Sequence, residues 1–474
     1  MAARAGTYNL APMAAAHDRS GGFGGFEPGE PLAGVARVPG SKSIAQRAIV
    51  CAGLARGTSR LDGVPGSDDV RATLDAVETM GVALARPAPR AHALAGIPPG
   101  PQSGWSPRAP VRVGESGTGA RLVTAALALA GRAGGAYEVV AAGTLRRRAS
   151  PALFEALARA GARIEPLGAA GGWPVRIEPC RPPSELRLAG PGSSQEVSAL
   201  LCASAAWPDE IAVVVEGAIP SRPYVELTRD VLARFGALVR EEPAPGGARF
   251  RVRGPLVASA EPLSIEPDAS AAAVALAAGV LTGGCVEVDG FDAGSRQGDL
   301  RIAEHLAAFG AAAELRGGKL VARGAPTRGA SLDLAGEPDL APVLAVVAAA
   351  AARACGESSR LVGLATLPGK ESSRIEVLAR GLRRAGFHAL ASRDALVVGP
   401  RASAARHEGA PPFDPPFDPP FDPRGDHRMA FAFALLGLIV PGVRVADPGC
   451  VAKSWPSFWD DLEALGARRV AGRA

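Results

Sequence analysis

The stretch LTRDVLARFGALVR, residues 227–240, contains the pattern that decides the fold. Its apolar residues recur at helical spacing up to Gly236, and a short run with strand character follows. Glycine just after a helix is typical of a C-terminal cap, because it adopts a left-handed conformation at little cost. The pattern occurs five more times, in LDAVETMGVALA (74–85), LFEALARAGARIE (153–165), LRIAEHLAAFGAAAEL (300–315), IEVLARGLRRAGFHAL (375–390) and WDDLEALGARRV (459–470). Six repeated units are therefore expected, with capping glycines that recur every 74–80 residues.

A second pattern alternates with the first and predicts six buried helices. Each copy starts with a helix of small apolar residues, continues through a turn with Gly or Pro, and ends in a strand rich in β-branched residues. The copies lie at 43–64, 119–143, 193–218, 268–291, 338–364 and 426–449. These helices are apolar nearly all round, which indicates burial, whereas the helices of the first pattern are amphipathic and should cover the outside. The expected fold class is α/β, built from repeated units with buried helices and outer sheets.

The length of the chain favours two domains of three units each. At 474 residues it exceeds what one hydrophobic core usually serves. The boundary is expected within RVRGPLVAS, after the third unit, which gives an N-terminal domain over 40–254 and a C-terminal domain over 255–474. Residues 1–30 are rich in Gly and Ala without periodicity, and are expected to form a flexible tail.

The composition is that of an ordinary globular protein and excludes several classes. Hydrophobic residues make up 47% and charged residues 21%, and the net charge of +5 is too balanced to indicate nucleic-acid binding. The cysteines form no CxxC pair and the histidines no HxxxH pair, so neither a disulfide scaffold nor a clustered metal site is expected. The longest apolar stretch, 340–352, is too short to span a bilayer, and no signal-like start is found. A cytoplasmic protein is expected.

The segment PPFDPPFDPPFDPRGD, residues 411–426, contains three tandem copies of a four-residue unit. Proline at this density prevents both helix formation and strand pairing. We therefore expect an extended, polyproline-like surface insertion over residues 411–424. Two interpretations stay open, a neutral expansion within a loop and a segment that binds a partner.

Polar residues collect just before the six predicted buried helices. They are Ser41-Lys42-Ser43, GESGT at 114–118, Ser193-Ser194-Gln195, Asp268-Ala269-Ser270, Glu337-Pro338-Asp339 and Asp426-His427-Arg428. Ser, Thr and Asp at such places are ordinary helix caps, but a cation there opposes the helix dipole unless an anion lies between them. Only four of the 52 basic residues are Lys, and three of these, Lys42, Lys370 and Lys453, lie at or near these segments. If the helix ends converge, they would suit a substrate with phosphate or carboxylate groups, and the acidic neighbours would suit proton transfer.

These segments resemble, in the same order, those of the 5-enolpyruvylshikimate-3-phosphate synthase family. The matching motifs are PGSKSIAQRAIVCAG, GESGTGAR, LRRRASPALFEALARAGARI, GSSQEVSALL, SRPYVELT, DASAAA, QGDLR, EPD, KESSR, DHRMAFAFALLGL and DPGCVAKSWPSFWDDLEALG. The likeness runs from about residue 35 to the end of the chain, and DHRMA, SKS with the following Arg47, and AKSWP are specific together. The resemblance implies the enolpyruvyl transferase fold, with residues 31–39 belonging to the C-terminal domain.

The resemblance also implies a reaction. A transferase of this family joins shikimate 3-phosphate to phosphoenolpyruvate and releases phosphate, in the shikimate pathway to chorismate and aromatic amino acids. The 5-hydroxyl adds to C2 of the enol while C3 is protonated, and the tetrahedral intermediate then eliminates phosphate. The two substrates are the only partners implied. No metal, organic cofactor, nucleic acid or membrane is implied, and a monomer is expected.

The functional positions of the family are carried over, residue by residue, onto the motifs that match. Asp339, Glu371 and Lys42 are expected to be catalytic. Shikimate 3-phosphate is expected to contact Lys42, Ser43, Arg47, Ser193, Ser194, Gln195, Ser221, Asp339 and Lys370. Phosphoenolpyruvate is expected to contact Lys42, Gly117, Arg148, Gln195, Arg374, Arg428 and Lys453.

Three departures from the family pattern leave alternatives open. Glu115 stands where Asn is common, and its carboxylate could weaken anion binding or reach a neighbouring Arg. Ala149 and Ser373 replace residues that are usually Pro and Asp. One alternative is a UDP-N-acetylglucosamine enolpyruvyl transferase, but the Cys usual in the mobile loop of that enzyme is missing between residues 112 and 150. The other is a non-catalytic anion-binding paralogue.

Overall fold

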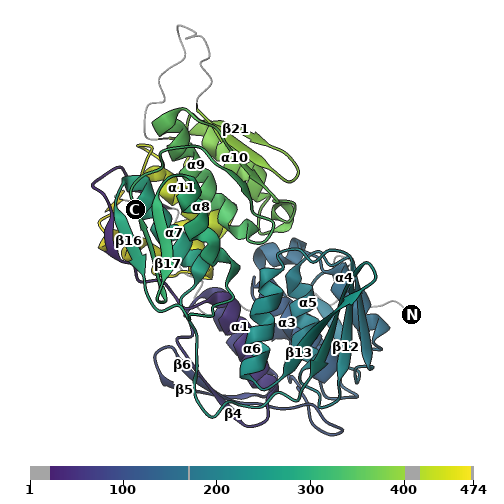
Figure 1. The fold of residues 1–474 in the computed structure, drawn as a ribbon. Coiled ribbons are helices and arrows are strands. Elements are labelled where there is room, and N and C mark those ends of the chain that lie inside the picture. Colours follow the sequence, from purple (N-terminus) through teal and green to yellow (C-terminus); the bar gives the residue numbers. More distant parts are fainter. Residues whose placement is uncertain (1–21, 169–170, 401–416, 471–474) are drawn as a thin grey trace.

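The computed structural model describes residues 22–168, 171–400 and 417–470, which fold into two halves (Figure 1). Each half has its own hydrophobic core. The core of the N-terminal half draws on residues 44–265, and that of the C-terminal half on residues 26–36 and 269–467. The site described below lies where the halves meet.

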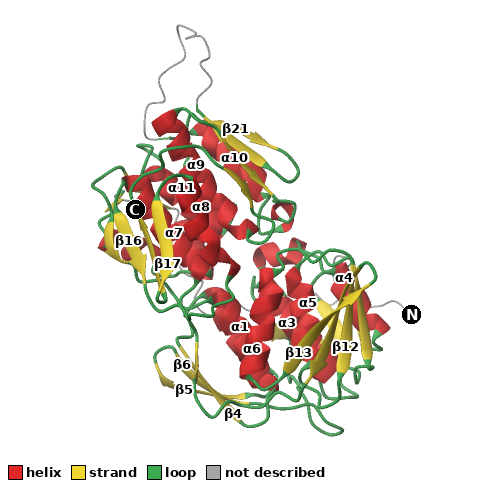
Figure 2. Ribbon diagram, in the orientation of Figure 1, coloured by secondary structure: helices red, strands yellow, loops and turns green. Residues whose placement is uncertain are grey.

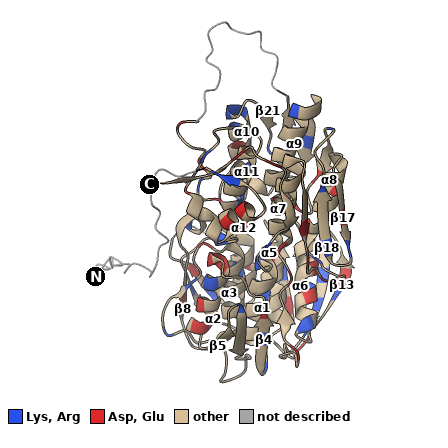
Figure 3. Cartoon of the chain, turned by 90° about the vertical axis from the view of Figure 1, so that its left-hand side faces the viewer, with Lys and Arg blue, Asp and Glu red and all other residues tan. Residues whose placement is uncertain are grey.

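Three apolar helices fill each core, and the strands lie outside them (Figure 2). They are α1 (Lys42–Leu54), α3 (Gly117–Ala130), α5 (Ser194–Ser204), α7 (Ala269–Thr282), α9 (Ala341–Cys355) and α11 (His427–Gly437). The three helices of each half pack against one another. Helix α7 has no charged residue and is buried almost throughout (Figure 3). The prediction of six buried helices is confirmed.

The second set of helices covers these cores and ends as the glycine pattern predicts. Its members are α2 (Asp68–Thr79), α4 (Pro151–Arg159), α6 (Pro223–Arg234), α8 (Ile302–Ala308), α10 (Arg374–Arg384) and α12 (Phe458–Ala464). The glycines that follow them have φ between 77° and 105°, at positions 81, 161, 236, 310, 386 and 466. This left-handed conformation is open to glycine at low cost, so the repeats terminate where the sequence indicates.

Five of the six units carry a four-stranded mixed sheet. The strand orders are β15-β4-β6-β5, β7-β8-β10-β9, β11-β12-β14-β13, β17-β18-β16-β3 and β19-β20-β22-β21. In the N-terminal half the strands are β4 (Thr58–Asp62), β5 (Ala83–Ala88), β6 (Ala91–Ala95), β7 (Val111–Arg112), β8 (Tyr137–Val140), β9 (Arg163–Pro166), β10 (Val175–Glu178), β11 (Glu185–Ala189), β12 (Ile211–Glu216), β13 (Leu238–Ala244), β14 (Gly247–Arg253) and β15 (Leu263–Ser264). In the C-terminal half they are β3 (Ala33–Val35), β16 (Cys285–Val288), β17 (Ala312–Arg316), β18 (Lys319–Arg323), β19 (Ser331–Asp333), β20 (Ser359–Val362), β21 (His388–Ala391) and β22 (Leu396–Gly399).

The sixth unit is completed by the start of the described chain. Strands β1 (Phe23–Gly24) and β2 (Phe26–Glu27) pair antiparallel with β23 (Val445–Ala446) and β24 (Arg468–Arg469). Phe26 is fully buried against aromatic rings of α12. The expected flexible tail is therefore wrong for residues 22–30, because this short aromatic run pairs and packs; residues 1–21 lie outside the described residues.

The chain crosses between the halves twice, and just before each crossing it contributes a strand to the half that it leaves. Strand β3 pairs with β16 of the C-terminal half, and β15 pairs with β4 of the N-terminal half. The second crossing thus lies near residues 266–268 and not at 254, because residues 256–265 pack into the first core. The crossings run side by side, with a bridge from Gly40 to Pro267.

The proline-rich insertion is anchored at its C-terminal end. Phe417 and Phe421 are 9% and 2% exposed, their rings meet edge to face at 5.3 Å, and Arg384 lies over the Phe421 ring at 4.5 Å. Phe421 also bridges to β23. The prediction of a surface insertion is therefore wrong for Phe417, Phe421 and Pro423, which are buried, whereas Asp418, Pro419, Asp422 and Arg424 are exposed. Residues 411–416 lie outside the described residues.

The long apolar stretch belongs to a helical run over Pro338–Cys355. By length and composition alone these 18 residues would suffice to cross a membrane, so the expectation that the stretch is too short is wrong. However, 78% of the run is buried inside the structure, where α9 packs against α7 and α11. The packing of α9 in the core therefore accounts for its apolar composition.

Candidate active site

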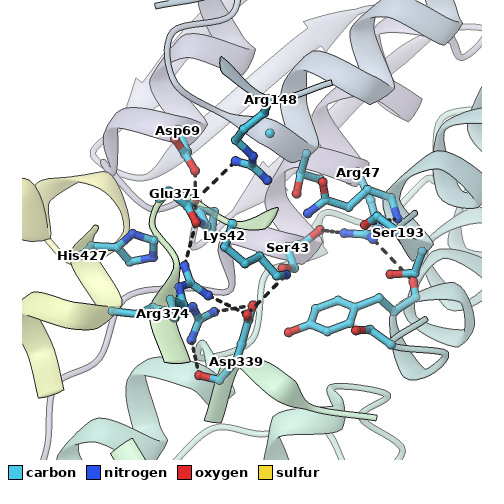
Figure 4. Close-up of a pocket in the computed structure, with 18 residues that line it drawn as sticks. Lys42, Ser43, Arg47, Asp69, Arg148, Ser193, Asp339, Glu371, Arg374 and His427 are labelled. Carbon is cyan, nitrogen blue, oxygen red and sulfur yellow. Dashed lines mark hydrogen bonds and ion pairs between the residues drawn. The ribbon is translucent and has the colours of Figure 1, made fainter. Parts of the chain in front are cut away.

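The starts of the buried helices converge on a pocket between the two halves (Figure 4). Helices α1, α3 and α5 approach from the N-terminal half, and α11 and the 3-10 helix η3 (Pro338–Leu340), which precedes α9, approach from the C-terminal half. The pocket encloses about 640 Å³, including its opening to solvent. Six cationic side chains line it against three carboxylates. The free N–H groups of helix starts add to this positive potential, so the pocket suits a multiply charged anion.

The residues expected at the site from the sequence come together here, with one placed just beyond the lining. Those that line the pocket are Lys42, Ser43, Arg47, Gly117, Arg148, Ser193, Ser194, Gln195, Ser221, Asp339, Lys370, Glu371, Arg374 and Arg428. Lys453 lies beside it, with Nζ 3.4 Å from Glu371 Oε1. Residues from both halves and from distant segments therefore share one space.

Lys42 stands in the first turn of α1 and is held by two contacts. Its ammonium Nζ lies 2.9 Å from Asp69 Oδ2, and its backbone N–H donates to Asp268 Oδ2 at 3.0 Å. Ser41 caps the same helix start by accepting from the Ile44 N–H. The Lys42 side chain is 15% exposed and lines the pocket, so it is held in position yet reaches the pocket.

Asp339 is surrounded by cations. Its oxygens lie 2.8 Å from Arg374 Nη1, 3.2 Å from Arg428 Nη2 and 3.3 Å from Lys370 Nζ. Burial by itself would raise the pKa of Asp339, but these three positive charges outweigh it and hold the pKa well below its usual range. The carboxylate is therefore ionised, as a proton acceptor must be.

Glu371 joins the two halves across the pocket. Arg148 Nη1 of the N-terminal half lies 3.6 Å from Glu371 Oε1, and Lys453 Nζ contacts the same oxygen at 3.4 Å. Burial would raise the pKa of Glu371, but Lys453, Arg374 and Arg148 lower it well below its usual range. The Nε and Nη1 groups of Arg148 are buried and make no hydrogen bond within the described residues. These groups are available to an anion in the pocket.

A second group of residues lines the opposite end of the pocket, at the start of α5. Ser193 caps this helix by accepting from the Gln195 N–H at 3.2 Å. Ser221 adopts a left-handed conformation with φ 51°. Arg47 is almost fully buried, and its guanidinium donates to Thr228 Oγ1 at 2.7 Å and to Ser198 Oγ at 3.2 Å. Arg47 thus braces α1 against α5 and α6 beneath the pocket floor.

Several residues around the pocket were missed by sequence reasoning. Asp69 and Thr118 line it, and Arg121 donates to Gln195 Oε1 at 3.1 Å while its guanidinium lies near the Trp173 ring. Arg121 follows Gly117 by one helical turn, so its spacing could have revealed it. For Asp69, the only sequence feature that could have pointed to the pocket was its position at the start of a helix.

His427, which stands at a predicted helix start but is not among the residues expected to contact a substrate, also lines the pocket. Burial, together with the charge of Lys42, lowers the pKa of His427 well below its usual range, so the ring is neutral. Neither ring nitrogen makes a hydrogen bond to another described residue. No group of three or more His, Cys, Asp or Glu side chains able to hold a metal occurs in the part of the chain that the structure describes.

Comparison with known families accounts for this arrangement. Residues 26–462 match the family model described as EPSP synthase (3-phosphoshikimate 1-carboxyvinyltransferase). The chain belongs to this family. Two relatives named 3-phosphoshikimate 1-carboxyvinyltransferase are similar along nearly their whole length. The relative from Laribacter hongkongensis is 36% identical over 93% of this chain and 98% of its own, and that from Rhizobium leguminosarum bv. trifolii is 35% identical over 93% and 96%.

Solved structures agree with the family assignment at the level of the fold. EPSP synthase from Acinetobacter baumannii superposes with a TM-score of 0.73 at 24% identity, covering 96% of this chain and all of the other. The enolpyruvyl transferase NikO from Streptomyces tendae superposes with a TM-score of 0.68 at 17% identity, with the same coverage. The enolpyruvyl transferase fold expected for an EPSP synthase is confirmed.

Proposed function

We propose that this chain is a 3-phosphoshikimate 1-carboxyvinyltransferase. It transfers the enolpyruvyl group of phosphoenolpyruvate to the 5-hydroxyl of shikimate 3-phosphate and releases phosphate, in the pathway to chorismate and aromatic amino acids. The observation that carries the proposal is the cationic pocket between the halves, with Asp339 and Glu371 ionised among its cations. The EPSP synthase family match along most of the chain supports it.

Phosphoenolpyruvate is bound by the cations that meet across the pocket. We assign its phosphate and carboxylate to Lys42, Arg148, Arg428 and Lys453, assisted by Arg374 and by Gln195. Gly117 supports this role, because a Cβ added there would lie 2.7 Å from Arg148 Nη1. A side chain at this position would displace Arg148, whose Nε and Nη1 make no hydrogen bond among the described residues.

Shikimate 3-phosphate is bound at the start of α5. Its phosphate accepts from Ser193, Ser194 and Ser221 and from free N–H groups of the helix, which favour an anion. Gln195, Ser43 and Arg47 lie around the ring, and Lys370 and Asp339 approach from the C-terminal half. The 5-hydroxyl then points to the Asp339 carboxylate.

Two carboxylates carry out the proton transfers of the proposed reaction. Asp339 is ionised and accepts the proton of the 5-hydroxyl as its oxygen attacks C2. Glu371 faces the methylene carbon and removes a proton from C3 when phosphate leaves. To protonate C3 in the first step, Glu371 must itself carry a proton, and the negative charge of bound substrate raises its pKa toward that state. Lys42 stabilises the charge of the tetrahedral intermediate.

Two alternatives make different predictions for the same assay. A UDP-N-acetylglucosamine enolpyruvyl transferase would release phosphate from phosphoenolpyruvate only with the nucleotide sugar as acceptor. A non-catalytic paralogue would bind anions and release none. We expect steady phosphate release with shikimate 3-phosphate and none with the nucleotide sugar, together with a product whose mass equals both substrates less phosphate. No release with either acceptor would overturn the proposal.

A single chain supplies every residue of the proposed site, so we propose that the enzyme acts as a monomer. Light scattering during gel filtration would show this. We also place the enzyme in the cytoplasm, because Cys51, Cys180, Cys202, Cys285 and Cys355 are free thiols, as expected in a reducing compartment. Cell fractionation tests this placement.

A further inference from the structure

Glu115 lies between the pocket and the turn that carries Arg148. It belongs to the loop before α3, and its Oε2 accepts from the Thr144 N–H at 3.2 Å and from the Thr144 hydroxyl at 2.9 Å. Thr144 is the second residue of the 3-10 helix η1 (Gly143–Arg147), and Arg148 follows at once. The carboxylate therefore contacts a threonine of the neighbouring turn and not an arginine.

The turn is shaped to receive this carboxylate. Gly143 has φ 47°, and a Cβ added there would lie 1.9 Å from Glu115 Oε1, so a side chain at this position would be strained and would displace the Glu115 carboxylate. Ala142 donates to the Gly114 carbonyl at 2.7 Å, and Leu145 is fully buried in the core. Ala142 and Leu145 thus hold the turn on either side of Thr144. Glu115 adds the side-chain contact that fixes the start of the turn.

Arg148 depends on this turn for its position. Its backbone N–H donates to the Leu145 carbonyl at 3.0 Å, but Nε and Nη1 of its guanidinium make no hydrogen bond among the described residues. Its ion pair with Glu371 is long, at 3.6 Å, and comes from the other half. Within the N-terminal half, the conformation of η1 determines where the guanidinium points.

Glu115 also faces the C-terminal half. Its backbone carbonyl accepts from Lys453 Nζ at 3.2 Å. Thr144 Cγ2 lies 3.9 Å from the place where a Cβ on Gly425 would stand, next to the start of α11. The contact between Glu115 and Thr144 therefore sits where the halves meet.

We propose that Glu115 is a positioning residue for phosphoenolpyruvate. Its carboxylate holds Thr144 and so presents Arg148, while its carbonyl holds Lys453. The inference rests on the proposed function, in which both cations bind this substrate. Glu115 touches no reacting atom, so its loss raises the KM for phosphoenolpyruvate far more than it lowers kcat.

The test compares five variants with the wild-type enzyme in the phosphate-release assay. For Glu115→Ala we expect the KM for phosphoenolpyruvate to rise about tenfold, as for a lost hydrogen bond to a charged group. We expect kcat within about threefold and an unchanged KM for shikimate 3-phosphate, which binds elsewhere. Glu115→Gln keeps an oxygen that accepts both hydrogen bonds, so its KM should stay within about threefold of wild type. Glu155→Ala, an exposed glutamate on α4, is the matched control and should equal wild type.

Thr144→Val completes a double-mutant cycle. It removes the hydroxyl but keeps the N–H, so we expect a smaller rise in KM, and the double variant should be no worse than Glu115→Ala. The inference would be overturned if the increases in KM of the two single variants multiplied in the double variant. It would also be overturned if Glu115→Gln raised the KM for phosphoenolpyruvate as much as Glu115→Ala does. An Ala variant equal to wild type, or a parallel loss of Tm, kcat and both KM values, would overturn it as well. An inactive wild-type chain would instead overturn the proposed function, on which the inference rests.

Discussion

The Arg374 guanidinium and the Asp426 carboxylate form a buried, two-pronged ion pair, with Nε 2.8 Å from Oδ2 and Nη2 3.2 Å from Oδ1. Asp426 also caps α11 by accepting from the Arg428 N–H at 3.0 Å, so the pair ties the starts of α10 and α11 together. The guanidinium binds Asp339 at 2.8 Å and Glu371 at 2.7 Å as well. One side chain therefore sets the positions of both carboxylates proposed to transfer protons.

Arg374→Lys should lower both activity and stability. Lysine keeps the charge but not the planar fork, so at least one of the three carboxylates loses its partner. An unpaired buried charge costs about 3–5 kcal/mol, and we expect kcat to fall at least about 100-fold. Urea unfolding and turnover check this, with Arg380→Lys as an exposed control on the same helix. Activity within a few-fold of wild type would contradict the proposed geometry.

Lys42→Met should abolish turnover while leaving the fold intact. The ammonium of Lys42 stands at the start of α1 and lines the pocket, and we expect a rate loss of at least about 1,000-fold, or about 4 kcal/mol in the barrier. Lys319→Met is the matched control, because Lys319 is 43% exposed on β18 and remote from the pocket. Circular dichroism should show native folding for both variants. Turnover near wild type in Lys42→Met would refute the assignment of its role.

Asp299 should contribute a negative slope to the free energy of unfolding as pH rises from about 4 to about 7. Burial raises the pKa of Asp299 to about 7, whereas an unfolded Asp titrates near about 4. In this window Asp299 binds more protons in the native state than in the unfolded state, so its contribution to stability decreases as pH rises. Asp299→Asn should flatten that slope in urea titrations at several pH values. An identical slope in wild type and variant would exclude Asp299 as the cause.

Deleting two of the three Pro-Phe-Asp repeats should leave turnover within about tenfold, a barrier change of about 1.4 kcal/mol or less. The shortened chain has one phenylalanine, which takes the place of Phe421, while Gly409 takes the place of Phe417. Because the Phe417 ring is then lost from the core, we expect stability to fall by about 2–4 kcal/mol.

Deleting a single repeat is the control for this prediction, because it keeps a phenylalanine at both places. It should match wild type in thermal unfolding. Equal destabilisation by the one-repeat and two-repeat deletions would show that the length of the segment matters and not its buried rings.

Binding of both substrates should compact the enzyme. The halves meet through Arg148 and Glu371 at 3.6 Å and through Lys453 and the Glu115 carbonyl at 3.2 Å, with cations on both walls. Without anions these walls repel each other, and bound substrate neutralises them. We expect a smaller radius of gyration in small-angle scattering with both ligands. The same radius at saturating concentrations would argue against closure driven by ligand.

The repeats made much of this fold predictable. Each capping glycine and each apolar helix follows from spacing over a dozen residues, so local periodicity alone locates them. The family motifs likewise predicted most of the cations and carboxylates that line the pocket. Strands β1 and β2 escaped prediction because two residues leave no periodicity to read. Phe417 escaped it because proline content dominates the local pattern.

By itself the sequence determined six units, two kinds of helix, the family and nearly all residues that line the pocket. These properties lie in short segments, where composition and spacing reflect local burial and known motifs. Only the tertiary structure decided that Arg374 holds three carboxylates, that Glu115 binds Thr144 and that Lys42 pairs with Asp69. Such contacts join residues from separate segments, and their distances follow from how two cores pack, which no local pattern encodes.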